Sequence, residues 1–273
     1  HEDKIQVTRL AEHGTIWAVV MGASKYQSQS IPSLKYARRD AEAFTDYLKE
    51  YMAVSADHIR TLYDEELTVL NMKSVLGTWL KKNAGRNDTV YIYFAGHGAP
   101  EADTNSNDGD GFEKYLLPTD ANINDLYTTA FPMEEVRNIF SRLNSDRVIF
   151  IVDSCFSGAS GGRTMLASNT RAANLSEQFW DRLSRGKGRV ILSASRANEV
   201  SVEDAKYGGG HGVFTHYLLE GLKGNADYSK EGDVDVDELY RYLSDKVPAA
   251  TGQRQTPVKK GEIEGTLIIG KAK

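Results

Sequence analysis

The chain has 273 residues, of which 40% are hydrophobic, and a formal net charge of −5 at pH 7. That length and apolar content suffice to bury the core of one α/β domain. The acidic balance gives no support for a nucleic-acid-binding surface, and no run approaches the ~18 consecutive apolar residues of a membrane span. We therefore expect neither a nucleic acid nor a membrane as a partner.

Helical and strand-like segments alternate along the chain, which is typical of a mostly parallel sheet covered on both faces. In the first predicted helix, for example, apolar residues recur at intervals of three and four from Ala37 to Leu48, so that one face is apolar. The predicted strands are 15–21, 59–63, 89–95, 147–153, 189–194 and 265–269, and the predicted helices are 35–50, 67–83, 133–143, 176–184, 212–221 and 236–246.

Two of the predicted strands are followed closely by residues with reactive side chains. Strand 147–153 leads into Cys155, the only cysteine of the chain, and strand 89–95 leads into His97 between two glycines. Because parallel strands end at the same edge of a sheet, we expect the thiol and the imidazole to lie together. A cysteine in such a place ordinarily serves as a small core hydrophobe. The pairing favours chemistry instead, because an imidazole can take the proton of a thiol with a pKa of ~8.5.

Six segments match one known family in the family's own order, and the most specific are Tyr93-Phe-Ala-Gly-His-Gly98 and Val152-Asp-Ser-Cys-Phe-Ser-Gly158. The others are 17–22, 34–41, 110–120 and 191–195. On these segments the chain resembles the caspase-like peptidases of clan CD (peptidase family C14), in particular bacterial caspase-homologue domains akin to metacaspases and orthocaspases. The resemblance implies a cysteine endopeptidase that acts on peptides or proteins through a Cys155/His97 dyad.

The resemblance also implies an architecture. We expect a caspase-hemoglobinase-like three-layer α/β sandwich, with a mostly parallel six-stranded sheet and helices on both faces. A single domain would cover residues 1–273, with a large-subunit-like part at about 14–160, a linker at about 157–187 and a small-subunit-like part at about 188–273. We expect a monomer and not a caspase-type dimer.

Three acidic residues lie at positions that, in this family, contact the substrate residue just before the scissile bond, which is called P1. Asp153 lies two residues before Cys155, on the same side of the strand end. Asp40 matches a metacaspase aspartate that faces the P1 pocket, and Glu203 falls where caspases carry a P1-binding arginine. Since carboxylates best accommodate a buried guanidinium, we expect cleavage after Arg or Lys. A helix-surface role for Asp40 and a one-residue shift in the alignment of Glu203 are the alternatives.

The expected mechanism follows from these positions. The Cys155 thiolate attacks the scissile carbonyl, and His97 protonates the departing amine and later activates the hydrolytic water. The peptide would lie extended beside a short strand by β-augmentation, and preorganised backbone donors would bind the oxyanion. The backbone groups expected to take part are the N–H groups of Gly98 and Cys155 for the oxyanion, and the strand Val200, Ser201 and Val202 for the peptide.

The segment between strands 147–153 and 189–194 is rich in Gly, Ser, Ala and Asn and is too long for an ordinary connection. In caspase-like peptidases, cleavage of this linker separates the two subunits. An enzyme that prefers basic P1 residues could therefore process itself at Arg163 or Arg171. A simple loop with a short helix is the alternative.

Two acidic stretches raise the question of calcium, although the dyad chemistry requires no cofactor. The composition of loop 99–112 suits either a solvated turn or the ligation of Ca²⁺ by oxygen atoms. Metacaspases take some of their calcium ligands from a segment with paired aspartates. The corresponding neighbourhood in this chain reads Ala130-Phe-Pro-Met-Glu134, so the metacaspase calcium site looks incomplete here. Stretch 227–238 fits an EF-hand loop, with Gly232 at position 6, or else a polar turn that caps the next helix. The candidate ligands are Asp227, Ser229, Glu231, Asp233, Asp235 and Glu238.

Two rival functions remain open, namely an inactive caspase-like scaffold and a cysteine-dependent transferase or amidase on another sheet. Inactive homologues usually lose the cysteine or the histidine, and both are retained here. The glycine-rich segment around His211 lacks the lysine and the spacing of a phosphate loop, so we expect a mobile turn there. A single thiol forms no internal disulfide and leaves the compartment open, with a cytoplasmic location as our expectation.

Overall fold

The structure is a computed structural model that describes residues 14–106, 111–154, 159–160, 163–164, 181, 183–185, 188–196, 199, 201–261 and 265–272. Four of the predicted elements or residues therefore lie wholly or largely outside the described part of the chain: Cys155, Arg171, Val200 and helix 176–184. Arg163 is described through its backbone alone.

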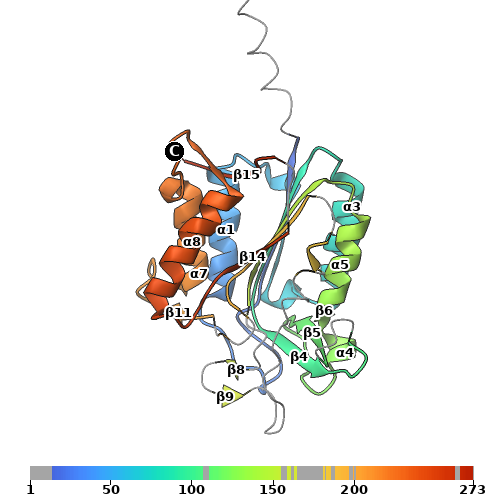
Figure 1. Cartoon of the computed structure of the whole chain (residues 1–273). Helices are drawn as coiled ribbons and strands as arrows, with labels where there is room; N and C mark the ends of the chain where they lie inside the picture. The colour runs from blue at the N-terminus through green and yellow to red at the C-terminus, as the bar shows by residue number, and fades with distance from the viewer. Residues whose placement is uncertain are drawn as a thin grey trace, which may run out of the picture.

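A six-stranded sheet forms the centre of the molecule, with the strand order β14-β10-β7-β3-β1-β2 (Figure 1). All neighbouring pairs are parallel except β10 and β14, which run antiparallel. The central strands are apolar runs because both of their faces are covered. The bounds are β1 (Ile16–Gly22), β2 (Ile59–Tyr63), β3 (Thr89–Ala95), β7 (Arg147–Asp153), β10 (Arg189–Ser193) and β14 (Val258–Lys260).

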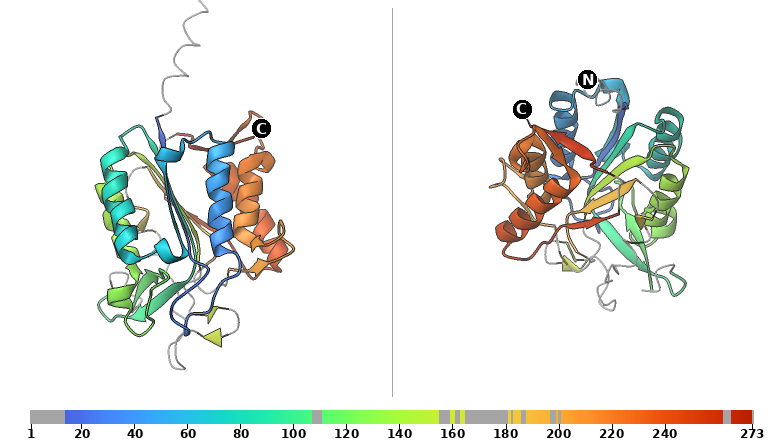
Figure 2. Two further views of the ribbon diagram at one scale, coloured as in Figure 1. Left: turned by 180° about the vertical axis from the view of Figure 1, so that it is seen from behind. Right: turned by 45° about the horizontal axis from the view of Figure 1, so that its top comes forward.

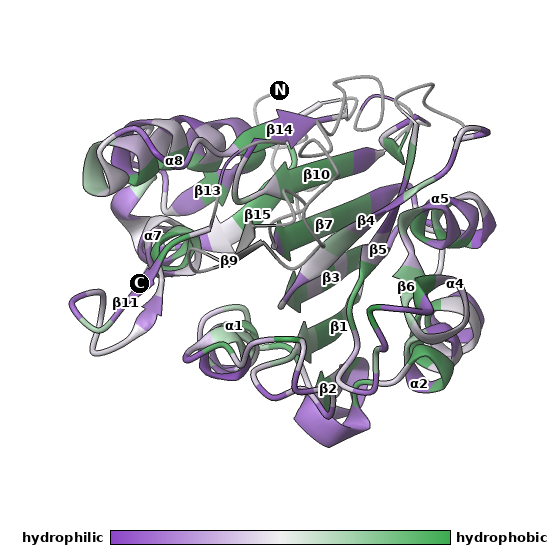
Figure 3. Cartoon of the chain, turned by 90° about the horizontal axis from the view of Figure 1, so that it is seen from below, coloured by the Kyte–Doolittle hydropathy of each residue, from purple (hydrophilic) through white to green (hydrophobic). Residues whose placement is uncertain are grey.

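Helices cover both faces of this sheet, which confirms the predicted three-layer fold. Successive strand residues point to opposite faces, so Tyr93 packs with one helix layer and Phe94 with the other. Figures 2 and 3 show the strands between the two layers. The first layer holds α1 (Ala37–Glu50), α7 (Val213–Glu220), η4 (Gly221–Asn225) and α8 (Val236–Thr251), and the second holds α2 (Val69–Lys73), η3 (Ser74–Trp79), α3 (Leu80–Asn83) and α5 (Met133–Arg142).

The prediction for the last strand of the sheet is wrong. The edge strand is β14, whereas the predicted segment 265–269 contributes to β15 (Ile268–Lys271), which pairs with β13 (Asp233–Asp235) in a separate two-stranded sheet. β14 carries two lysines, a common device of edge strands, and this polarity hides it from a search for apolar runs.

Smaller elements lie around the end of the sheet where β3 and β7 finish (Figure 1). The predicted loop 99–112 is in part a hairpin, since β4 (Gly98–Ala102) pairs with β5 (Phe112–Leu116), which in turn pairs with β6 (Phe131–Pro132). The segment expected to be a mobile turn includes a strand, because β12 (His211–Gly212) pairs with β11 (Glu203–Asp204). Also at this end are η2 (Asp64–Glu66), α4 (Leu126–Thr129), β8 (Ala159–Ser160) and β9 (Arg163–Thr164) (Figure 1). The short helix η1 (Ala56–His58) directly precedes β2 at the opposite end.

Within the described residues, no helix combines the length and the apolar character that a bilayer crossing demands.

Candidate active site

The strands that precede His97 and Cys155 are direct neighbours and end in register. Ala95 at the end of β3 lies opposite Asp153 at the end of β7, and the Gly96 N–H donates to the Asp153 carbonyl oxygen at 3.2 Å. His97 and Cys155 each follow their strand end by two residues. The chain therefore leaves both strands at one edge of the sheet, and the description of the second strand end stops at Ser154.

His97 is a buried imidazole with a defined proton. Its Nε2 lies 2.8 Å from the Pro32 carbonyl oxygen, which can only accept, so Nε2 carries the hydrogen and Nδ1 is the basic nitrogen. Burial lowers the pKa of His97, and the hydrogen bond to Pro32 opposes that shift. The imidazole is consequently neutral near pH 7, which is the form that a general base needs.

A second contact orients His97 from its backbone. The His97 N–H donates to the Tyr26 hydroxyl at 2.9 Å, and the two rings lie 5.2 Å apart. Tyr26 and Pro32 belong to the loop after β1, and the buried Asp64 carboxylate anchors this loop by accepting the N–H groups of Ser24 (2.8 Å) and Lys25 (3.0 Å). Neither Tyr26 nor Pro32 was among the predicted site residues. Pro32 acts through its backbone carbonyl, and Tyr26 is brought to His97 from 71 residues away, so neither contact leaves a signal in the sequence.

Asp40 and Asp153 approach each other around Gly212. Both carboxyl groups are buried, at 3% and 8% residue exposure. A Cβ atom on Gly212 would lie 2.9 Å from Asp153 Oδ2 and 3.0 Å from Asp40 Oδ2, so the two oxygens are no more than about 6 Å apart. The Gly212 N–H also donates to Asp40 Oδ2 at 2.9 Å. A side chain at this position would therefore force at least one of the two carboxyl groups to shift.

Glu203 lies close enough to both aspartates to act on them electrostatically. Its carboxylate accepts the N–H groups of Lys35 (3.0 Å) and Tyr36 (3.1 Å), at the start of α1. Burial raises the pKa of Asp40 well above its usual range, and the charges of Asp153 and Glu203 raise it further. Burial also raises the pKa of Asp153, with a smaller contribution from Glu203. The structure thus brings together three carboxyl groups from distant parts of the sequence.

Hydroxyl groups hold Asp153 in place. The Thr215 hydroxyl donates to Asp153 Oδ2 at 2.7 Å. Because this bond takes the one hydroxyl hydrogen of Thr215, the Tyr93 hydroxyl must be the donor in its own 2.7 Å contact with Thr215 Oγ1. The Ser201 hydroxyl forms a further hydrogen bond to Asp153. These hydrogen bonds lower the pKa of Asp153 against the effect of burial. Sequence reasoning did not identify Thr215 or Tyr93, because Tyr93 stands in an apolar strand and Thr215 in a mostly apolar helix, where both resemble ordinary core residues.

Of the predicted peptide-pairing segment, Ser201 and Val202 directly precede β11, which begins only at Glu203, and the backbone of Val202 is turned toward the protein interior. The Val202 N–H donates to Oε1 of the buried Gln255 at 2.9 Å, and the Val202 carbonyl accepts the Val213 N–H at 2.8 Å. Backbone groups alternate in direction along a strand, so those of Ser201 and Glu203 point to the opposite edge. That edge is the one on which an added peptide strand could pair.

The direction of the N–H group of Gly98, the predicted oxyanion donor, also follows from its position in a ladder. It lies opposite Leu116 in the β4–β5 ladder, and the Leu117 N–H donates to the His97 carbonyl at 2.9 Å. This pattern makes Gly98 and Leu116 a pair without mutual hydrogen bonds, so the Gly98 N–H points away from β5.

The EF-hand-like stretch forms a helix cap in this structure. Asp235 accepts the N–H groups of Asp237 and Glu238 at 2.8 Å each, and Glu238 Oε2 accepts the Asp235 N–H at 3.2 Å, which completes a capping box for α8. The Asp227 carboxylate accepts the Gly232 N–H at 2.9 Å. Among the residues that the structure describes, no group of three or more His, Cys, Asp or Glu side chains is arranged to hold a metal ion.

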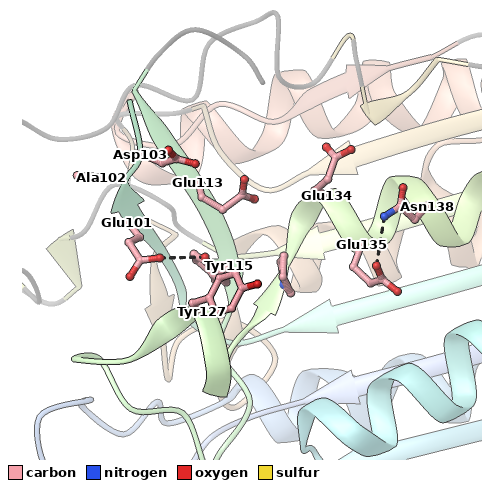
Figure 4. Close-up of a pocket in the computed structure, with 10 residues that line it drawn as sticks. Glu101, Ala102, Asp103, Glu113, Tyr115, Tyr127, Glu134, Glu135 and Asn138 are labelled. Atoms are coloured by element: carbon pink, nitrogen blue, oxygen red, sulfur yellow. Dashed lines mark hydrogen bonds between the residues drawn. The ribbon is translucent and has the colours of Figure 1, made fainter. Parts of the chain in front are cut away.

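An acidic pocket of about 430 Å³ opens between the β4–β5 hairpin and α5 (Figure 4). The Tyr115 hydroxyl donates to Glu101 Oε2 at 2.9 Å on one wall, and Asn138 Nδ2 donates to Glu135 Oε2 at 3.2 Å on the other. The pocket joins residues of the predicted acidic loop with residues near segment 130–134. Its carboxylates are those of Glu101, Asp103, Glu113, Glu134 and Glu135.

Comparisons with known proteins agree with this architecture. A profile of the caspase domain of peptidase family C14 matches residues 15–265. Metacaspase-1B of Aspergillus clavatus is 30% identical over 129 residues, which are 46% of this chain and 27% of that protein. Metacaspase-1 of Saccharomyces cerevisiae is 24% identical over 150 residues, which are 52% of this chain and 33% of that protein. The matched part is thus about a third or less of each relative.

A solved structure supports the fold independently. Protein GSU0716 from Geobacter sulfurreducens superposes with a TM-score of 0.61 and 18% sequence identity, covering 92% of this chain and 95% of that one. At this identity the likeness concerns the fold alone. The profile match extends over most of the chain and includes both strand ends described above. The chain therefore belongs to the caspase-domain family of cysteine-type peptidases.

Proposed function

We propose that this chain is an endopeptidase that cleaves after Arg, and also after Lys, with Cys155 as the nucleophile and His97 as the general base. The observation that carries the specificity is the convergence of Asp40, Asp153 and Glu203 beside the end of β7. Buried carboxyl groups so close together repel one another when ionised, and a guanidinium or ammonium group would relieve that repulsion while gaining charge-assisted hydrogen bonds. A P1 aspartate would instead add a further negative charge.

The catalytic steps follow from the orientation of His97. Nδ1 takes the proton of the Cys155 thiol, and the thiolate adds to the scissile carbonyl carbon while the Gly98 N–H stabilises the oxyanion. The protonated imidazole then gives its proton to the leaving amine, and the C–N bond breaks to leave a thioester. A water molecule, deprotonated by the same imidazole, hydrolyses the thioester and restores the thiol. The hydrogen bond to Pro32 holds the ring in one tautomer throughout.

We also propose that the enzyme processes its own linker at Arg163 or Arg171. Arg163 lies in β9, where it pairs with Ser160 of β8. A peptide must be extended and unpaired to add to the edge formed by Ser201 and Glu203. Cleavage at Arg163 therefore requires that β9 separate from β8.

A monomer is the expected assembly. In the described part of the edge strand β14, Lys260 forms an ion pair with Asp181 at 2.9 Å, and Lys259 forms one with Asp237. Lysines on an edge strand disfavour pairing with the same edge of a second copy. Sedimentation analysis tests this expectation directly.

The decisive experiment compares fluorogenic peptides that differ only in P1, with Arg, Lys or Asp at that position. We expect turnover of the Arg and Lys peptides and none of the Asp peptide, and we expect Cys155→Ala to abolish all turnover while retaining the fold. Intact-mass spectrometry of the wild type beside Cys155→Ala reports self-cleavage and its sites. Full activity in Cys155→Ala, or a preference for Asp at P1, would overturn the proposal.

A further inference from the structure

The β11–β12 hairpin is joined to the start of α1 by polar contacts. The Glu203 carboxylate accepts the backbone N–H groups of Lys35 and Tyr36, and Arg39 Nη1 donates to the Gly209 carbonyl oxygen at 2.6 Å. His211 Nδ1 lies 2.5 Å from Asp40 Oδ1. Two of the three carboxylates proposed to bind the P1 cation therefore also hold this hairpin in place.

His211 is a titratable group in direct contact with the proposed P1 pocket. Its side chain is 12% exposed and that of Asp40 is 4% exposed, so the pair is largely shielded from solvent. As a neutral imidazole, His211 donates its Nδ1–H to Asp40 and adds no charge to the pair. As an imidazolium it places a positive charge beside that carboxylate. The two protonation states thus present different charges to a substrate cation.

Burial, together with two neighbouring cations, keeps His211 neutral near pH 7. Arg39 on α1 and Lys223 on η4 are the cations that act on it, and His216 on α7 is the neighbouring imidazole. The facing strand of the hairpin carries Asp204 and Glu203, and Asp153 lies beyond Asp40. Burial lowers the pKa of His211, and Arg39 and Lys223 lower it further. Protonation is therefore expected below the ordinary histidine value of ~6.5.

We propose that His211 is a specificity-determining residue: when neutral it orients Asp40 as an acceptor for a P1 cation, and when protonated it places a positive charge beside that acceptor and opposes the cation. This inference rests on the function proposed above. By linkage, a P1 cation and a proton on His211 each weaken the binding of the other to the same extent. The preference for charged over neutral P1 side chains therefore falls as the pH falls through the His211 titration.

The test uses two peptides with Arg or citrulline at P1, because citrulline has nearly the same shape without the charge. The ratio of their kcat/KM values cancels the titration of His97 and Cys155, which affects both peptides alike. In the wild type we expect this ratio to fall by about fivefold to tenfold in all as the pH is lowered from 7.5 through the His211 titration, because one partly screened charge is opposed. In His211→Asn, which retains an N–H donor but does not titrate, the fall should move to lower pH.

His216→Asn is the matched control, because His216 is the neighbouring imidazole and makes no contact with a pocket carboxylate in the described contacts. It should leave the pH course unchanged. A pH course in His211→Asn that coincides with the wild type overturns the inference and leaves the proposed P1 specificity intact, provided that Asp40→Asn still lowers the ratio. The absence of any Arg preference at every pH overturns both.

A binding measurement keeps the test independent of turnover and of the folding of the His211 variants. In full-length Cys155→Ala protein, NMR titration of the His211 ring reports its pKa with and without agmatine, a guanidinium ligand without a scissile bond. We expect agmatine to lower the pKa of His211 by about 0.7 to 1 unit, which is the same fivefold to tenfold coupling. An unchanged pKa at saturating agmatine contradicts the inference.

Discussion

Replacing Asp153 by asparagine removes one charge from the proposed P1 pocket with little change of shape. The amide oxygen can still accept the Thr215 hydroxyl, which now lies 2.7 Å from Asp153 Oδ2. A guanidinium about 4 Å from this carboxylate gains about 4 kcal/mol at an effective dielectric of about 20, before the cost of desolvation. Asp40, whose nearest oxygen is no more than about 6 Å away, retains part of the attraction. We therefore expect Asp153→Asn to reduce the transition-state stabilisation of an Arg peptide by about 2–3 kcal/mol.

This loss corresponds to a fall of about 30- to 160-fold in kcat/KM for an Arg peptide. The citrulline peptide should change by less than about threefold, because it carries no charge to lose. Asp204→Asn provides the matched control, since Asp204 is an exposed carboxylate on the hairpin strand that also carries Glu203. Equal losses for both peptides would show that Asp153 acts on the nucleophile and not on P1, and an unchanged Arg peptide would refute the charge argument altogether.

Stability gives an independent measure of the same group. The pKa of Asp153 is raised in the folded state, so its ionisation opposes folding: the free energy of unfolding should fall as the pH rises from ~4 through the folded-state pKa. In Asp153→Asn this decrease should be smaller, which urea denaturation at several pH values would detect. A steeper decrease in the variant would contradict the assigned direction of the pKa shift.

The remaining predictions concern other parts of the site. Tyr26→Phe removes the acceptor of the His97 N–H and should lower kcat by about tenfold with little change in KM, as steady-state kinetics would show. Burial lowers the pKa of His97, so the acid limb of the pH profile of kcat/KM for the citrulline peptide should lie below pH ~6.5, and a limb well above that value would contradict the neutral imidazole. Gly212→Ala crowds two carboxylate oxygens and should destabilise the fold by about 1–3 kcal/mol in urea denaturation while abolishing the Arg preference. Asp235→Ala removes the N-cap of α8 and should lower the free energy of unfolding by about 1 kcal/mol. If calcium raises the Tm of the wild type and not that of this variant, the stretch is a metal site and not only a helix cap.

Local patterns in the sequence were enough to predict most of the sheet and the ends of its strands. The runs 89–95 and 147–153 are recognisable in the sequence because strands covered on both faces are apolar throughout. Parallel strands end at one edge of a sheet, so the neighbouring positions of the His97 and Cys155 segments followed without coordinates. The same local rules failed for β14, whose lysines give no apolar run, and for the β4–β5 hairpin, whose polar composition looks like a loop.

The tertiary structure alone decided the surroundings of these strand ends. Asp40, Asp153 and Glu203 are separated by long stretches of chain, and only the packing of α1 and the β11–β12 hairpin beside β7 brings their carboxyl groups together. The Pro32 carbonyl that orients His97 and the His211 ring that contacts Asp40 depend on the same long-range packing. Periodicity records what neighbours in the chain do, whereas a pKa depends on burial and on charges that the fold brings near. The reactive groups can therefore be read from the sequence, and their protonation and specificity arise from the fold.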